Sequence, residues 1–291
     1  MRAPTVAIAT CAAQPAPDAE NRLLIDAVRA RGADARAVAW NARPPGGWDA
    51  FDAVVVRATW DYTAALPEFL DWAAGIGGRL HNRPDVIAWN ADKRYLFDLG
   101  RAGLPVVAGE HVAPGASFRP PSGRYVVKPT VSAGARDTAL YDAARADAAR
   151  EHVRALHAAG RDVLVQPYLS RVDDEAETAV VLIDGQPSHC MRKGPLLALD
   201  QPPVDGLFRV EDMRRRACDD DVLHLAHRTH AFVAERFGVP LYARVDVLRD
   251  DTGEPAVLEV ELIEPSLFLD HAPGSAERLA GALLRRTRPG A

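Results

Sequence analysis

The sequence predicts a chain of mixed class, in which an α/β domain is followed by an α+β region. Within residues 1–83, apolar strand segments alternate with an amphipathic helix, an order that is typical of a small parallel sheet. From residue 178 onward, β-branched segments come in pairs joined by tight turns, at Asp184-Gly185 and around Gly253. Such pairs are typical of antiparallel hairpins.

The composition excludes several classes of protein. The 291 residues are 48% hydrophobic and 26% charged, which is enough for two or three hydrophobic cores. A net charge of -5 argues against a general nucleic-acid binder, which would carry a basic excess. We expect no membrane segment, because the longest apolar runs are too short to cross a bilayer. Since Cys11, Cys190 and Cys218 show no paired spacing, we expect a cytoplasmic protein without a disulfide framework or a zinc site.

The N-terminal domain is expected to contain three strands and two helices. Asp18 is placed to cap the first helix, whose apolar stripe begins at Leu23 and which ends at Gly32. The second helix packs Phe69 into the core and stops at Gly75. The strands cover residues 5–10, 35–40 and 53–57, and the second helix covers 66–74.

Polar side chains stand at the ends of two of these strands. Thr10 closes the first, and Arg57 begins a polar and aromatic run that continues through Asp61 and Tyr62. Because ligands of parallel sheets gather at the carboxyl ends of the strands, we expect these four residues to contact a small charged metabolite. Arg57 would bind a carboxylate and Asp61 an amine. A capped loop with core aromatics is the alternative.

Lysine is rare in this chain, since only Lys93, Lys128 and Lys193 occur among 35 basic residues. A lysine is a compact point charge that fits a phosphate oxygen where a planar guanidinium does not. Asn90 is the expected cap of a helix that ends at Gly103, which places Lys93 in its first turn. A cation is unusual there unless an anion binds at the same place.

Lys128 ends a strand that is followed by a loop of small residues, Ser132-Ala133-Gly134-Ala135. Small side chains allow backbone N–H groups to surround phosphate oxygens, so Ser132 and Gly134 are candidate phosphate contacts. The loop fits neither the Walker pattern nor the dinucleotide-binding glycine pattern.

The segment Gln166-Pro167-Tyr168-Leu169 follows a strand and joins two halves of the chain. Its backbone could bind an adenine edge, with Tyr168 and Leu169 on the two sides of the ring, and Glu177 could bind ribose hydroxyls. Residues 194–218 lack periodicity, which indicates either a lid or a disordered segment. Helices are expected at 142–159, 219–238 and 275–285, with a hairpin formed by 178–183 and 187–193.

A second hairpin, within residues 242–266, carries the candidate metal ligands. Because side chains alternate along a strand, Glu259 and Glu261 share a face that Asp246 on the partner strand can join. Carboxylates together with phosphate oxygens are the ligands by which Mg²⁺ is held beside a nucleotide. Arg244, on the same face, would add a fixed cation. A solvated acidic strand face is the alternative.

The order of these motifs resembles that of the ATP-grasp superfamily, to which glutathione synthetase and D-alanine ligases belong. The resemblance implies that two α+β subdomains clasp ATP, with Lys93 and Lys128 on its phosphates, residues 166–169 on adenine and Glu177 on ribose. It implies an N-terminal domain over 1–83 and an ATP-grasp domain over 84–291, divided into 105–168 and 169–291. The chain departs from the usual pattern in having Glu259-Val260-Glu261 where Glu-x-Asn is common, and in a loop poorer in glycine.

Four stretches, VVVRATWDY, WNADKRYL, SHCMRK and ELIEPSL, resemble the narrower family of O-ureido-serine cyclo-ligases. This resemblance implies ATP-dependent activation of a small amino-acid-like carboxylate as an acyl phosphate. Attack by the substrate's own nitrogen then gives D-cycloserine, with ADP, phosphate, CO₂ and ammonia released. Arg244 and Lys193 would assist phosphoryl transfer, and His189 either moves a proton or is a buried, hydrogen-bonded histidine.

Two alternatives remain open on the sequence alone. One is an intermolecular carboxylate–amine ligase on the same fold, and the other is a nucleotide-binding protein without turnover. A homodimer is also compatible with the sequence, and no nucleic-acid or membrane partner is expected.

Overall fold

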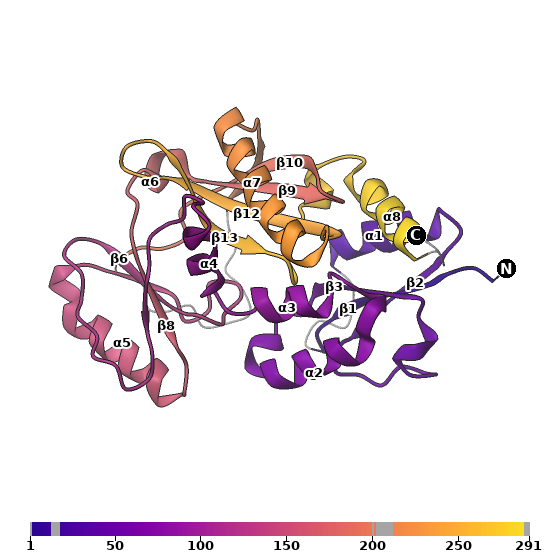
Figure 1. Cartoon of the computed structure of the whole chain (residues 1–291), viewed down its shortest axis with the longest axis horizontal. Coiled ribbons are helices and arrows are strands. Elements are labelled where there is room, and N and C mark those ends of the chain that lie inside the picture. Colours follow the sequence, from indigo (N-terminus) through magenta and orange to yellow (C-terminus); the bar gives the residue numbers. More distant parts are fainter. Residues whose placement is uncertain (1, 13–17, 200, 202–211, 288–291) are drawn as a thin grey trace.

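The computed structural model describes residues 2–12, 18–199, 201 and 212–287, and it contains three sheets (Figure 1). The first is parallel, with strand order β2-β1-β3-β4, and the other two are antiparallel, with orders β5-β8-β6-β7 and β11-β10-β9-β12-β13. The predicted combination of α/β and α+β structure is confirmed. The sheets occupy residues 5–81, 110–167 and 177–261, and the expected domain boundaries stay a prediction.

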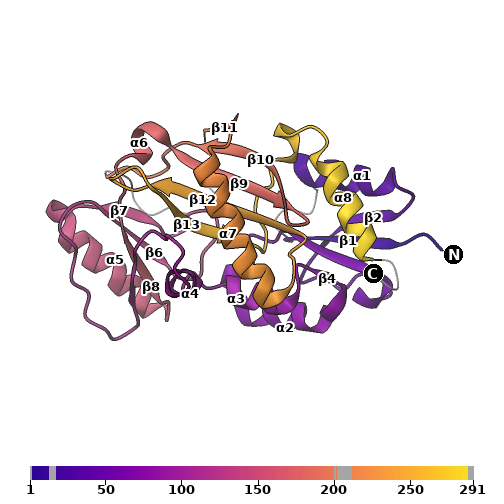
Figure 2. The same ribbon diagram turned by 45° about the horizontal axis from the view of Figure 1, so that its top comes forward.

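The parallel sheet is covered on both faces because successive side chains of its buried strands alternate in direction. Val6 and Ile8 pack with α1 and α8 on one face, and Ala7 and Ala9 pack with α2 and α3 on the other. The last helix therefore returns to the first domain, where it lies beside α1 (Figures 1 and 2). The elements are β1 Thr5–Thr10, β2 Asp34–Ala39, β3 Ala53–Ala58, β4 Leu80–His81, α1 Ala19–Arg29, α2 Leu66–Ile76, α3 Pro84–Asn90 and α8 Ser275–Arg286.

The cap at Asp18 is confirmed, since its carboxylate accepts a hydrogen bond from the Asn21 backbone N–H at 2.7 Å. Leu23, which was expected in the buried stripe of α1, is 40% exposed, and Ile25 is buried instead. The helix expected to end at Gly103 is present, but its expected start and its cap at Asn90 are wrong. Asn90 is the last residue of α3, and a new helix, α4, covers Tyr95–Arg101.

The middle sheet carries α5, Ala146–Ala158, on one face, where Val153 and Leu156 pack against Val127 and Val165 (Figure 1). Its strands are β5 Glu110–Val112, β6 Tyr125–Pro129, β7 Ala139–Tyr141 and β8 Val163–Pro167.

The third sheet is crossed on one face by α7, Asp220–Phe237 (Figure 2). Its first hairpin turns at Asp184 and Gly185, which both have positive φ, 52° and 78°, as a two-residue hairpin turn requires. Its strands are β9 Glu177–Ile183, β10 Gln186–Lys193, β11 Met213–Arg216, β12 Tyr242–Arg249 and β13 Pro255–Glu261, and α6 covers Val172–Glu175. Among the described helices, none combines the length and the apolar character needed to cross a membrane.

The segment 194–218 is not irregular throughout, because Met213–Arg216 forms β11 and pairs with β10. The expected lid stays a prediction. Residues 202–211 lie outside the described chain. The expectation of no disulfide is also wrong, since Cys190 and Cys218 are bonded, with their Cα atoms 5.6 Å apart. Arg216 pairs with Cys190 across the two strands, and this register brings Cys218 next to it.

Two asparagine side chains bond the backbone at the start of β12, along β13 and just beyond β13. Asn82 donates to the carbonyl oxygens of Tyr242 and Leu262 at 2.9 and 2.8 Å and accepts from the Leu241 N–H at 2.6 Å. Asn90 donates to the Val260 carbonyl at 2.7 Å and accepts from the Leu262 N–H at 2.8 Å. An edge strand whose polar groups are paired in this way is held in one register.

Replacing Asn82 by alanine should lower the free energy of unfolding by roughly 3 kcal/mol, because three buried backbone groups lose their partner. Urea unfolding of the variant and of Asn41→Ala, an exposed control on the first domain, provides the measurement. Equal stability of the two variants would contradict this role.

Candidate active site

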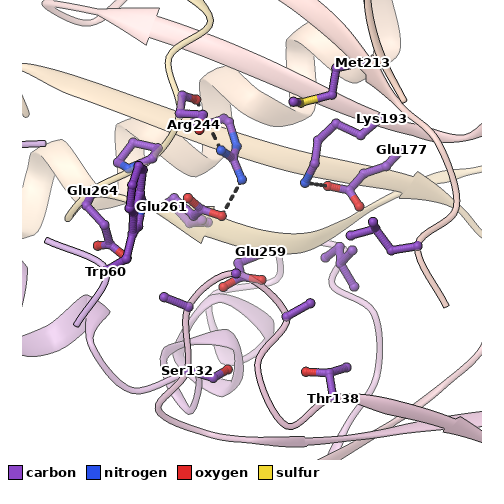
Figure 3. Close-up of a pocket in the computed structure, with 18 of the residues that line it drawn as sticks. Trp60, Ser132, Thr138, Glu177, Lys193, Met213, Arg244, Glu259, Glu261 and Glu264 are labelled. Carbon is purple, nitrogen blue, oxygen red and sulfur yellow. Dashed lines mark hydrogen bonds and ion pairs between the residues drawn. The ribbon is translucent and has the colours of Figure 1, made fainter. Parts of the chain in front are cut away.

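A cavity of about 630 Å³ lies where residues of all three sheets meet (Figure 3). Most of the predicted site residues line it together. They are Arg57, Tyr62, Lys93, Lys128, Ser132, Gly134, Gln166, Tyr168, Leu169, Glu177, Lys193, Arg244, Glu259 and Glu261.

Asp246 lies beneath the cavity floor and is 1% exposed. Arg244 donates to both of its oxygens at 2.8 Å, and the Lys193 ammonium lies 3.0 Å from one of them. Burial would raise the pKa of Asp246, but the two cations outweigh it and hold that pKa well below its usual range. The carboxylate is therefore charged and fully bonded.

Glu259 and Glu261 belong to β13, where Glu259 pairs with Asp246 of β12, and both face the cavity (Figure 3). The Lys93 ammonium lies 3.1 Å from Glu259, and Arg244 pairs with Glu261. Burial raises the pKa of Glu261 to about 7. For Glu259 the effect of burial is outweighed by Lys93 and Lys128, so its pKa is lowered.

A β-bulge shapes this part of β13. Asp246 pairs with Glu259 but the next residue, Val247, pairs with Val257, so that Leu258 is an extra residue on β13. Leu258 and Glu259 both line the cavity as a result. The bulge lets one strand present an apolar side chain and a carboxylate side by side.

These carboxylates fit a magnesium ion that arrives with a phosphate ligand. Within the described ranges, no three His, Cys, Asp or Glu side chains are grouped closely enough to hold a metal by themselves. The side chains of Glu259 and Glu261 are 25% and 28% exposed, whereas both Asp246 oxygens are bonded to cations. Since Mg²⁺ commonly takes one or two carboxylates together with substrate phosphates, Glu259 and Glu261 have the suitable chemistry.

Two lysines come from separate elements to the same part of the cavity. Lys93 follows α3 and donates to the carbonyl and hydroxyl oxygens of Ser132 at 2.7 and 3.1 Å, which ties it to the small-residue loop. Lys128 is the last residue but one of β6, and burial lowers its pKa to about 8. Lys93 lies between α3 and α4, so its predicted place in the first turn of a helix is wrong. Lys93 nevertheless lines the cavity, as predicted.

The cavity becomes apolar toward the end of β8. Gln166 donates to the Val107 carbonyl at 3.0 Å, which fixes the strand end from which Tyr168 and Leu169 follow. Leu248 and Leu258 were missed by the sequence reasoning and form apolar lining contributed by β12 and β13. These residues form an apolar slot, which is suited to bind a flat heterocycle.

Glu177, expected at a ribose, also lines the cavity, and Lys193 donates to its carboxylate at 2.6 Å. Burial raises its pKa to about 8, against the effect of Lys193. The structure thus places Glu177 beside the charged floor.

The opposite end of the cavity is formed by the first domain. Arg57 is 3% exposed and pairs with Glu20, a residue that the sequence reasoning missed. Glu20 also accepts a hydrogen bond from the Leu267 N–H at 3.1 Å. In the part of the chain that the structure describes, the Nε and Nη1 groups of Arg57 have no hydrogen-bond partner.

Four predicted residues are not among the described lining residues: Asp246, described above, and Thr10, Asp61 and His189. Thr10 is 1% exposed, and Asp61 accepts a hydrogen bond from the Trp40 indole at 2.7 Å, so an amine contact by Asp61 is not supported. His189 donates to the Leu267 carbonyl at 2.8 Å and is bonded to Ser188 at 2.9 Å. Burial lowers the pKa of His189 to about 4, and three residues of β10 separate it from Lys193. His189 is therefore a buried, hydrogen-bonded histidine, which was the second of the two roles that the sequence allowed.

The parallel sheet, the two antiparallel sheets and the charged cavity between them define an ATP-grasp enzyme. A family model described as the D-cycloserine synthetase DcsG N-terminal domain matches residues 6–82. The cycloserine biosynthesis protein DcsG of Streptomyces lavendulae is 35% identical over 284 residues, which cover 91% of this chain and 93% of the relative. The chain therefore belongs to the DcsG family of D-cycloserine synthetases, and the family resemblance seen in the sequence is confirmed.

Solved structures agree with this assignment. The crystal structure of D-cycloserine synthetase DcsG matches with a TM-score of 0.89 and 33% identity, covering 98% of this chain and 100% of the other. The ATP-grasp ligase PsnB, in complex with its minimal precursor, Mg and ADP, matches with a TM-score of 0.62 and 20% identity over 98% and 97% of the two chains. The second likeness supports the fold.

Replacing Arg244 by methionine should cost about 3–5 kcal/mol of folding stability, because it leaves the buried Asp246 without its bidentate partner. The matched control is Arg249→Met on the same strand, whose partners Asp219 and Asp221 are half exposed and whose loss should cost about 1 kcal/mol or less. Chemical denaturation measures both, and equal losses would refute the role of the buried pair.

Glu264 provides a pH-dependent test of the same cavity. Burial and the neighbouring Glu261 raise its pKa from 4.5 to about 8. Between these values the native protein holds a proton that the unfolded chain releases, so the stability of wild type relative to Glu264→Gln should fall as pH rises from about 5 to 8. Urea unfolding of both proteins across this range gives the difference. A difference that stays constant would show that Glu264 titrates normally.

Proposed function

We propose that the protein uses ATP and Mg²⁺ to activate a substrate carboxylate as an acyl phosphate. The observation that carries the proposal is the convergence of Lys93, Lys128 and Lys193 with Glu259 and Glu261 on one cavity, in a member of the DcsG family. Adenine would lie in the apolar slot at residues 166–169, and the triphosphate would extend toward the charged floor.

Each part of the floor has a role in phosphoryl transfer. Glu259 and Glu261 would hold Mg²⁺, which supplies charge neutralisation at the transferring phosphoryl group. Lys93 and Lys128 bind phosphate oxygens, and Arg244 stands where charge develops as the substrate carboxylate attacks. Arg244 keeps its orientation through its bonds to Asp246.

The substrate we propose is O-ureido-D-serine, and the product is D-cycloserine. Once the carboxylate is phosphorylated, the nitrogen bonded to the side-chain oxygen attacks the acyl carbon and phosphate leaves. The reacting groups belong to one molecule, so no second substrate has to be brought into place. The carbamoyl group is then released by hydrolysis as CO₂ and ammonia.

We further propose that the protein acts in the cytoplasm, where ATP is available, and that it forms a homodimer. Light scattering on the purified protein measures the second point directly.

With ATP, Mg²⁺ and O-ureido-D-serine as the single co-substrate, the enzyme should release ADP and form D-cycloserine in equal amounts. Coupled ADP detection and mass spectrometry of the product measure the two. If ADP appeared only after a second amine was added, the intermolecular ligase would replace this proposal.

Glu259→Gln should reduce ADP formation by about 100-fold or more, because a carboxylate that holds the metal is lost. The same substitution at Glu254, exposed at the turn of the same hairpin, should leave activity unchanged. Thermal melts of both variants check that the fold is retained, and an active Glu259→Gln enzyme would remove the metal assignment.

A further inference from the structure

Glu264 lies just beyond β13 and lines the cavity at the end formed by the first domain. Figure 3 shows its carboxyl group near Trp60, on the side of Glu261 that is away from Lys193. The charged floor lies on one side of it, and Arg57 and Tyr62 belong to the same end of the cavity. Glu264 therefore stands between the phosphate region and the region left for the body of the substrate.

Six of the other carboxylates at or beneath this cavity are bonded to neighbours, and the seventh, Asp270, is exposed and lies 3.8 Å from the imidazole of His271. Glu177 and Asp246 are bonded to Lys193, Glu259 to Lys93, and Glu20 to Arg57. Glu261 pairs with Arg244, and Asp18 caps α1. Within the described residues, by contrast, neither an ion pair nor a side-chain hydrogen bond joins Glu264 to a cation. Its carboxyl group faces the cavity and is available to a ligand.

The ring closure that we propose above requires a base. The attacking nitrogen carries a proton, and this proton must leave as the new carbon–nitrogen bond forms. Such a base must lie beside the acyl carbon on the substrate side, since the phosphate side is occupied by cations and metal ligands. His189 cannot serve, because both of its ring nitrogens are bonded outside the cavity.

On the basis of that proposed function, we propose that Glu264 is the general base of the ring-closing step. Its carboxylate takes the proton from the nitrogen while the nitrogen's electron pair forms the bond to the acyl carbon. The carbon–oxygen bond to phosphate breaks, and phosphate leaves with the electron pair of that bond. The protonated Glu264 then returns its proton to solvent or to the released phosphate.

The surroundings of Glu264 suit this role. Burial, reinforced by Glu261, raises its pKa to about 8, and a base is most effective when its pKa lies near the working pH. Tyr62, which lines the same end, is unsuited to be the base, because burial and Glu264 itself raise the pKa of its hydroxyl well above the usual value.

The test separates activation from ring closure in Glu264→Gln, with Glu254→Gln as the control. Hydroxylamine converts an acyl phosphate into a hydroxamate, so its capture reports activation without ring closure. In the presence of ATP, Mg²⁺, O-ureido-D-serine and hydroxylamine, we expect Glu264→Gln to release ADP within about threefold of wild type. We expect its D-cycloserine formation to fall by about 100-fold or more, with hydroxamate formed in its place.

The outcomes are distinct. If Glu264→Gln lost ADP release and ring formation to the same degree, the residue would act before ring closure, for example by holding the substrate, and the base assignment would be overturned. If it formed D-cycloserine at the wild-type rate, no base would be needed at this position. If wild type itself gave neither ADP nor hydroxamate with this substrate, the proposed function would fall first, and this inference with it.

Discussion

The structure of this site depends on a buried ion pair network whose centre is Asp246. A carboxylate with 1% exposure is costly to keep charged, and it remains so because Arg244 binds both of its oxygens and Lys193 binds one. The same two cations also reach Glu261 and Glu177. The floor is therefore nearly balanced in charge before a ligand arrives. A triphosphate adds negative charge, which this balance accommodates best when a divalent cation enters with it.

The backbone that carries these charges is held from outside. β13 is the edge strand of its sheet, and Asn90 donates to the carbonyl of Val260 on its free side. Asn82 and Asn90 also bond the carbonyl and the N–H of Leu262, the residue that follows the strand. The same strand passes from the apolar slot at Leu258 to the substrate end beyond Glu261. One strand thus sets the separation between the nucleotide and the group to be activated, and the first domain fixes that strand in place.

Much of this arrangement is visible in the sequence because it follows from local rules. The alternation of side chains along a strand places Glu259 and Glu261 on one face. The rarity of lysine in this arginine-rich chain singled out three residues, and all three line one cavity. The predictions that were wrong have a common cause, because contacts between residues far apart in the sequence decided the structure at these positions. Asn90 resembles a helix cap but bonds to β13, 170 residues away. The Cys190–Cys218 bond depends on the register of β11, and the exposure of Leu258 depends on a bulge, neither of which local sequence specifies.

The central claim is that ATP and magnesium lie between the acidic hairpin and the lysines. A crystal structure with a non-hydrolysable ATP analogue and Mg²⁺ tests it most directly. The account predicts the adenine beside Leu169, the terminal phosphate within bonding distance of Lys93 and Lys128, and the metal on Glu259 and Glu261. An analogue bound elsewhere, with these side chains still paired only to one another, would contradict it.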